Sequence, residues 1–207
     1  MEKGSELPKI VREDVYFDLP GEQNTESVIE AVIDRINATG IKHVVVATST
    51  GKTALAFARK IGTRAQVIAV VSAPYRREWG RPWPCLEPTI RKELEDLRVM
   101  IVDRGPYVFH NSMLEGAKTR YPSAESLVRD TLYFFGDGIK VAVEVILMAV
   151  QCGYLEPYQD VIGVGGTSKG ADAAVIARAT YPATVFSEDQ KKRLEIREII
   201  AMPRAKA

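Results

Sequence analysis

The chain has 207 residues, 46% of them hydrophobic, so it can bury a core of ordinary size without disulfides or a metal ion. It carries 28 Lys and Arg against 27 Asp and Glu, and this balance provides no field that would hold nucleic acid or an anionic membrane. We therefore expect one domain over residues 1–207, with residues 1–12 as a loose arm and with no nucleic-acid or membrane partner. Any bound anion must be held by local geometry.

Two further features of composition bear on the compartment. Cys85 and Cys152 lie far apart and form no CxxC pair, and we recognise no signal peptide, so we expect a reduced, cytoplasmic protein. The longest apolar stretch, residues 139–150, contains Lys140 and Glu144 and is shorter than the roughly 20 residues that cross a bilayer. It predicts a buried helix.

The first half of the chain alternates short apolar runs with segments of helical spacing. A short strand is predicted at the first run, followed by a helix that Asn24 or Thr25 can cap and that Gly40 ends. The later runs are β-branched, as in strands covered on both faces, and their alternation with helices predicts a parallel sheet wound by right-handed crossovers. The predicted strands are 15–17, which ends at the turn 19–21, and 43–47, 66–71 and 99–102. The predicted helices are the capped one, whose apolar positions run over 28–36, and 53–61 and 89–97.

The second half continues this alternation. Helical spacing runs over 123–135, is broken at Gly136-Asp137-Gly138 and resumes to residue 151. Residues 160–164 form the fourth parallel strand, and another helix is predicted to start near Gly170. Residues 194–202 alternate apolar and charged side chains, which predicts a half-exposed strand at a sheet edge.

The segment 47–53, Ala-Thr-Ser-Thr-Gly-Lys-Thr, joins a buried strand to a helix. Its hydroxyls, its glycine and the positive end of the helix dipole together favour an anion, and phosphate is the natural guest. It is not a Walker A loop, because that motif requires a glycine where Val46 stands. Simple capping of the helix by the hydroxyls is an equal alternative. The predicted phosphate-binding residues are Thr48, Ser49, Thr50, Gly51, Lys52 and Thr53.

A second glycine-rich segment, residues 163–172, also follows a predicted strand. Its glycines let a ligand approach the main chain, although they match the dinucleotide-binding spacing only in part. Close packing of the strand on a helix explains the same glycines. Two such loops in one domain strengthen each other, and the residues predicted to contact the rest of the ligand are Gly165, Gly166, Thr167 and Ser168.

Few side chains are suited to acid–base catalysis near neutral pH. His110, beyond the third strand, is better placed than His43, which starts a strand. Asp137 either links two helices or points at a ligand, and His110 and Asp137 are the catalytic candidates. A structural salt bridge is the commoner role for a carboxylate such as Asp103. No set of His, Cys and carboxylates has metal-ligand spacing, so no metal site is expected.

The loop 72–88 is rich in Pro, Arg and Trp and follows the second parallel strand. It would fold over the same sheet edge as the two glycine-containing loops, where an aromatic ring could stack on a planar ligand. A surface loop packed by its own aromatics, or a subunit contact, is an equal alternative. Its candidate residues are Arg76, Arg77, Trp79, Arg81 and Trp83.

Four segments carry a family resemblance when taken in order: VVVATSTGKTA, FFGDGIKVAVEVILMA, DVIGVGGTSKGADAAV and EIIAMPR. Over residues 15–204 the chain resembles the stand-alone pyruvate kinase C-terminal-domain-like proteins, a form of the pyruvate kinase alpha/beta domain known mainly from archaea. The resemblance implies a three-layer α/β/α sandwich with a mostly parallel sheet in the strand order 3-2-1-4-5. It also implies FMN as a ligand, and in full pyruvate kinases the loop resembling Thr48 to Thr53 holds the phosphate of an allosteric sugar bisphosphate. Nothing resembles the barrel domain of pyruvate kinase, so no pyruvate kinase activity is expected.

The leading hypothesis is a protein that binds a phosphorylated small molecule, with FMN expected, at the carboxyl ends of the first and fourth parallel strands. Adjacent strands at that point form the switch point at which ligands bind such sheets. One alternative is an enzyme, either a flavin-dependent oxidoreductase or a phosphoryl-handling catalyst with Lys52 compensating charge. Another alternative is a regulatory module that forms a homo-oligomer, in which binding of an effector shifts the contacts between subunits.

Overall fold

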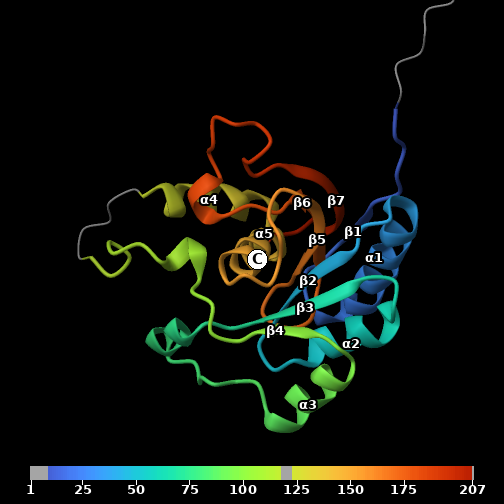
Figure 1. Ribbon diagram of the computed structural model, residues 1–207, viewed down its shortest axis with the longest axis horizontal. Coiled ribbons are helices and arrows are strands. Elements are labelled where there is room, and N and C mark those ends of the chain that lie inside the picture. The colour runs from blue at the N-terminus through green and yellow to red at the C-terminus, as the bar shows by residue number, and fades with distance from the viewer. Residues whose placement is uncertain (1–8, 118–122, 207) are drawn as a thin grey trace, which may run out of the picture.

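The computed structural model describes residues 9–117 and 123–206, which form one seven-stranded sheet in the order β1-β7-β6-β5-β2-β3-β4 (Figure 1). Most of the expected N-terminal arm, residues 1–8, lies outside the described part of the chain. Neighbouring strands are parallel except that β6 runs antiparallel to β5 and β7. The strands are β1 (Val15–Phe17), β2 (His43–Thr48), β3 (Gln66–Val71), β4 (Met100–Val102), β5 (Asp160–Gly165), β6 (Ala173–Arg178) and β7 (Ile196–Pro203).

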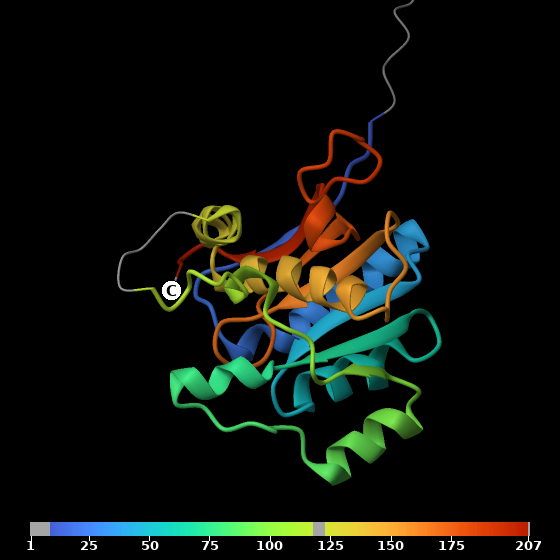
Figure 2. The ribbon, with the colours of Figure 1, turned by 60° about the vertical axis from the view of Figure 1, so that its left-hand side comes forward.

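Helices cover both faces of this sheet, which confirms the predicted three-layer α/β/α arrangement (Figure 2). One face carries α1 (Thr25–Thr39), α2 (Lys52–Ile61) and α3 (Pro88–Asp96). The other carries α4 (Ala124–Leu132) and the most buried helix, α5 (Asp137–Gln151). None of the helices in the described ranges combines the length and the apolar character that a membrane span requires.

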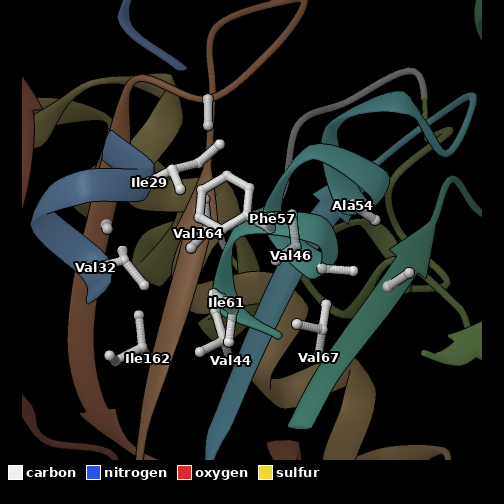
Figure 3. Packing of buried hydrophobic residues seen from close by; sticks show 14 of the residues in the cluster. Ile29, Val32, Val44, Val46, Ala54, Phe57, Ile61, Val67, Ile162 and Val164 are labelled. Atoms are coloured by element: carbon white, nitrogen blue, oxygen red, sulfur yellow. The ribbon is translucent and has the colours of Figure 1, made fainter. Parts of the chain in front are cut away.

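The two apolar layers follow from the period of two along each strand. In β2, Val44 and Val46 face α1 and α2, whereas Val45 belongs to the layer under α5. Figure 3 shows Phe57 of α2 and Ile29 of α1 lying against the first of these faces. Because both faces are covered, the central strands are apolar at nearly every position, which is the pattern that predicted them.

The predicted order of the first four parallel strands is confirmed, since β4-β3-β2-β5 is the order 3-2-1-4. The helix predicted to start near Gly170 is wrong, because this segment forms the antiparallel strand β6. Ala173 and Val175 of β6 pack in the α5 layer, and Ala174 and Ile176 pack in the opposite layer. A strand that is buried on both faces and rich in alanine shows no alternation, so its sequence resembles that of a helix.

The insertion of β6 also changes the position of the last strand. The prediction that residues 194–202 lie at a sheet edge is wrong, because β7 lies between β6 and β1. The three-residue strand β1 forms that edge instead, pairing in parallel with β7 from Val15↔Ala201 to Phe17↔Pro203. The alternation along β7 comes from partial cover of its faces.

The turn before α1 lacks the expected side-chain cap but contacts the segment that follows β5. Neither Asn24 nor Thr25 caps α1 through its side chain, so that expectation is wrong, whereas Gly40 ends the helix as predicted. Asn24 Nδ2 donates to the Leu19 carbonyl at 2.8 Å. Thr25 Oγ1 accepts the main-chain N–H of Ala171 at 3.0 Å, which ties this turn to the segment after β5.

Candidate ligand-binding cleft

A cleft of about 1010 Å³ lies at the carboxyl ends of β2, β3 and β5. The two glycine-containing segments predicted from the sequence meet there, as expected for neighbouring parallel strands. Eight of the ten residues predicted to bind the ligand line the cleft, and the two that do not are Gly51 and Gly165. The lining residues are Thr48, Ser49, Thr50, Lys52, Thr53, Gly166, Thr167 and Ser168.

The loop between β2 and α2 is shaped by Gly51, whose φ of 90° lies in the left-handed region. A Cβ here would lie 2.4 Å from Ile90 Cγ2, so the position excludes a side chain on packing grounds as well. Thr48 Oγ1 accepts the Gly51 N–H at 3.0 Å, and Ser49 Oγ lies 2.9 Å from Ser72 Oγ. Within the described residues, the side chains of Thr50, Lys52 and Thr53 make no hydrogen bond, so they are free to meet a ligand.

The segment after β5 combines packing glycines with a polar rim. A Cβ on Gly165 would lie 2.1 Å from the Gly138 carbonyl oxygen of α5, so close packing explains this glycine. The same holds for Gly163, which lies inside β5. Asp172 is fully buried, and its Oδ2 accepts the N–H groups of Thr167 at 3.0 Å and of Gly21 at 2.9 Å. This carboxylate therefore fixes the rim of the cleft to the turn before α1.

Another part of the cleft lining is aromatic. Trp79, from the 3-10 helix after β3 (Pro74–Trp79), stacks on Tyr107 with ring centroids 5.2 Å apart and 20° between the planes. His110 meets the Trp79 ring edge-on at 5.1 Å. The loop 72–88 thus folds over the predicted edge, with Trp79 and Arg81 in the cleft lining. The 3-10 helices Pro74–Trp79 and Val108–His110 both lie on the left in Figure 1.

Two buried charges on α5 complete this part of the lining, and sequence reasoning did not select them for the site. Lys140 and Glu144 are one helical turn apart, line the cleft, and form an ion pair of 2.6 Å with both side chains 5% exposed. Glu144 Oε1 also accepts the Phe109 N–H at 3.2 Å, which holds the segment carrying His110. The available signal was a pair of charges with i,i+4 spacing in an otherwise apolar stretch.

Both catalytic candidates, His110 and Asp137, line the cleft. Asp137 is the first residue of α5, so the helix break is a junction between two helices and also brings this carboxylate to the site. Burial raises the pKa of Asp137, the charge of Asp172 raises it further, and Lys140 opposes the change. Burial likewise raises the pKa of Tyr107, although a hydrogen bond with Ser72 counters it.

A carboxylate outside the cleft lining, Glu115, contacts His110 Nδ1 at 3.0 Å. Burial acts to raise the pKa of Glu115, but the hydrogen bond and charge of His110 and the charge of Arg129 outweigh burial, so the pKa is lowered. Arg129 Nη1 donates to the same carboxylate at 3.1 Å. His110 is therefore held in a network with a second carboxylate.

Comparison with known families gives a match to the model described as pyruvate kinase, alpha/beta domain, over residues 26–177. The chain belongs to this family. The resemblance noted from four sequence segments is thereby confirmed. The matched part of this pyruvate kinase alpha/beta domain includes both glycine-containing segments and α5, whereas β1 and β7 lie outside it.

Two residues that the sequence analysis considered for catalysis, His43 and Asp103, do not line the cleft. His43 starts β2, far from the carboxyl ends of the strands. Asp103 forms an ion pair with Arg91, which is the structural role that was the commoner reading. Across residues 9–117 and 123–206, no three or more His, Cys, Asp or Glu side chains form a group that could hold a metal ion.

Proposed function

We propose that this cleft binds a phosphorylated small molecule, with its phosphate at the loop between β2 and α2. The observation that carries the proposal is the convergence of free hydroxyls, the Lys52 side chain and the first turn of α2 on one part of a single cleft. Backbone N–H groups at a helix start, together with a lysine, hold phosphate through charge-assisted hydrogen bonds. Lys169 lines the same cleft and adds a second positive charge.

FMN is the ligand that we propose. The expectation comes from the family resemblance, and two features of the cleft support it. Its volume of about 1010 Å³ accommodates a ligand of this size. The aromatic pair Trp79 and Tyr107 belongs to the lining of the same cleft and suits a planar ring.

A second candidate function is enzymatic, either a flavin-dependent oxidoreductase or a phosphoryl-handling enzyme. It is favoured by the presence of two titratable groups, His110 and Asp137, in the lining of the same cleft. Reduction of bound FMN by NAD(P)H would distinguish the oxidoreductase from a passive binder. No pyruvate kinase activity is expected of the chain.

The test is a comparison of FMN affinity between the wild type, Lys52→Ala and Lys60→Ala. Loss of a charge-assisted hydrogen bond at Lys52 should weaken FMN binding about tenfold to a hundredfold. Lys60 is the control, because it lies on the same helix, is exposed and does not line the cleft. Equal affinity of all three proteins would place the phosphate elsewhere, and a purified protein that neither releases nor binds a flavin would exclude FMN.

A further inference from the structure

The buried pair Lys140 and Glu144 is unexplained by packing alone. Both side chains are 5% exposed, in a helix whose other buried side chains are apolar. Removing two charges from water costs several kcal/mol each, and well-packed apolar residues often replace such a pair without loss of stability. Since both residues line the cleft, their chemistry is available to a ligand.

The hydrogen bonds around the Lys140 ammonium leave one of its three N–H groups without an acceptor in the described residues. Its Nζ donates to Glu144 Oε2 at 2.6 Å and lies 3.4 Å from His110 Nε2. An ammonium can only donate, so Nε2 uses at most one further Nζ–H, whereas Nδ1 lies near both an acceptor, Glu115 Oε1 at 3.0 Å, and a donor, Arg129 Nη1 at 3.3 Å. The third Nζ–H has no acceptor among residues 9–117 and 123–206.

The charge and the surroundings of this donor select its partner. The carboxylate of Glu144 already balances the charge of Lys140, so a second anion would leave a net negative charge in a poorly solvated space. A neutral carbonyl oxygen accepts the hydrogen bond without adding charge. The Nζ lies 5.7 Å from the centroids of both the Phe109 and Tyr133 rings, and Tyr133 lines the cleft, so an aromatic surface lies beside the donor.

We propose that Lys140 donates a hydrogen bond to a ring carbonyl of a planar heterocycle bound at the aromatic part of the cleft. This rests on the proposed function in one respect, namely that the same molecule carries the phosphate held near Lys52. It adds the class of ring and the atom that is recognised. His110 and Glu144 act in this proposal as positioning residues, because both contact the ammonium of Lys140.

Inosine monophosphate and adenosine monophosphate test the proposal, because C6 carries a carbonyl in the first and an amino group in the second, while the neighbouring N1 carries a hydrogen only in the first. Calorimetry on the wild type should show inosine monophosphate binding about tenfold to a hundredfold more tightly, the value of one hydrogen bond to a charged donor. An amino group facing Lys140 offers no acceptor. Equal affinities would overturn the proposal, and this measurement needs no variant.

The double variant Lys140→Met with Glu144→Gln removes the donor together with the opposite charge of the pair, so the net charge of the two positions stays zero. The new amide oxygen can still accept the Phe109 N–H. The double variant should bind the two nucleotides equally and should lose FMN affinity by a similar factor. Ribose-5-phosphate, which has no ring carbonyl, should bind unchanged. A preserved nucleotide preference, or unchanged FMN affinity, would overturn the assignment of Lys140.

The two proposals fail in different ways. If ribose-5-phosphate binds as tightly as FMN and the nucleotides, the phosphate site stands and the ring site is refuted. If Lys52→Ala has no effect but the carbonyl preference holds, the phosphate is misplaced and the role of Lys140 stands. If neither the nucleotides nor FMN bind to the wild type, the ring site is refuted.

Discussion

Two parts of the cleft are built in different ways. The part at α2 is formed largely by one contiguous segment, residues 48–53, whose Lys52 side chain is exposed and unpaired within the described residues. The aromatic part is assembled from the segments after β3 and β4 and from α5, and its charge, Lys140, is buried and paired. An exposed lysine costs the fold nothing, whereas a buried one has a function only if its partners hold it in place.

The largest expected effect tests whether the buried pair acts as a unit. Lys140→Met alone leaves the Glu144 carboxylate buried without its partner and should lower the free energy of unfolding by about 3 to 5 kcal/mol. Adding Glu144→Gln should restore most of that loss, because no charge then remains to be solvated. Urea denaturation of the three proteins measures this coupling, and additive effects of the two substitutions would contradict it.

The contact of α5 with β5, which joins the two parts, gives the next effect. Gly165→Ala would place a Cβ 2.1 Å from the Gly138 carbonyl oxygen and 2.7 Å from the Ala142 nitrogen, both backbone atoms. We expect a loss of about 3 kcal/mol in the free energy of unfolding, because neither atom can move without displacing the helix. Gly116→Ala is the matched control, since a Cβ there meets no atom of the described residues within 4 Å.

The pH dependence of stability tests Asp137, which lies at the start of α5. Burial raises the pKa of this carboxyl above its ordinary value of 3.8, so the folded state binds its proton more tightly than the unfolded chain does. The contribution of Asp137 to stability should therefore fall as pH rises from near 3.8 through the raised pKa.

Denaturation of the wild type and of Asp137→Asn across this range measures the effect. The wild type should become less stable relative to the variant with rising pH and then level off. A difference that is constant with pH, or one that changes in the opposite direction, would show that the carboxyl is not destabilised by burial.

The smallest expected effect sharpens the contrast between the two lysines. Lys52→Ala should change the free energy of unfolding by no more than about 0.5 kcal/mol, because its exposed side chain has no partner in the described part of the chain. Thermal denaturation without ligand checks this. A large loss of stability would mean that the loop after β2 depends on Lys52 for its structure, and the effect on FMN affinity would then need another explanation.

Most of the fold followed from the sequence because its signals are local. Runs such as Val44–Val46 identify strands covered on both faces, and the helical spacing along α1 and α2 places helices between them. The segment β6 was mistaken for a helix because burial on both faces removes the alternation that marks a strand. The position of β7 inside the sheet was missed for the same reason, because the unpredicted strand β6 lies between β5 and β7.

The sequence by itself determined the parallel strands and the hydroxyl- and glycine-containing turn after β2, because each depends on residues that are neighbours in the chain. Only the tertiary structure decided which glycines serve packing, since the contact of Gly165 with α5 joins residues 27 positions apart at Gly138. It also decided the aromatic part of the cleft, where Trp79, His110 and Lys140 meet from three separate segments. A charge in an apolar helix becomes a specific donor only when distant residues supply its partners, and no local pattern encodes them.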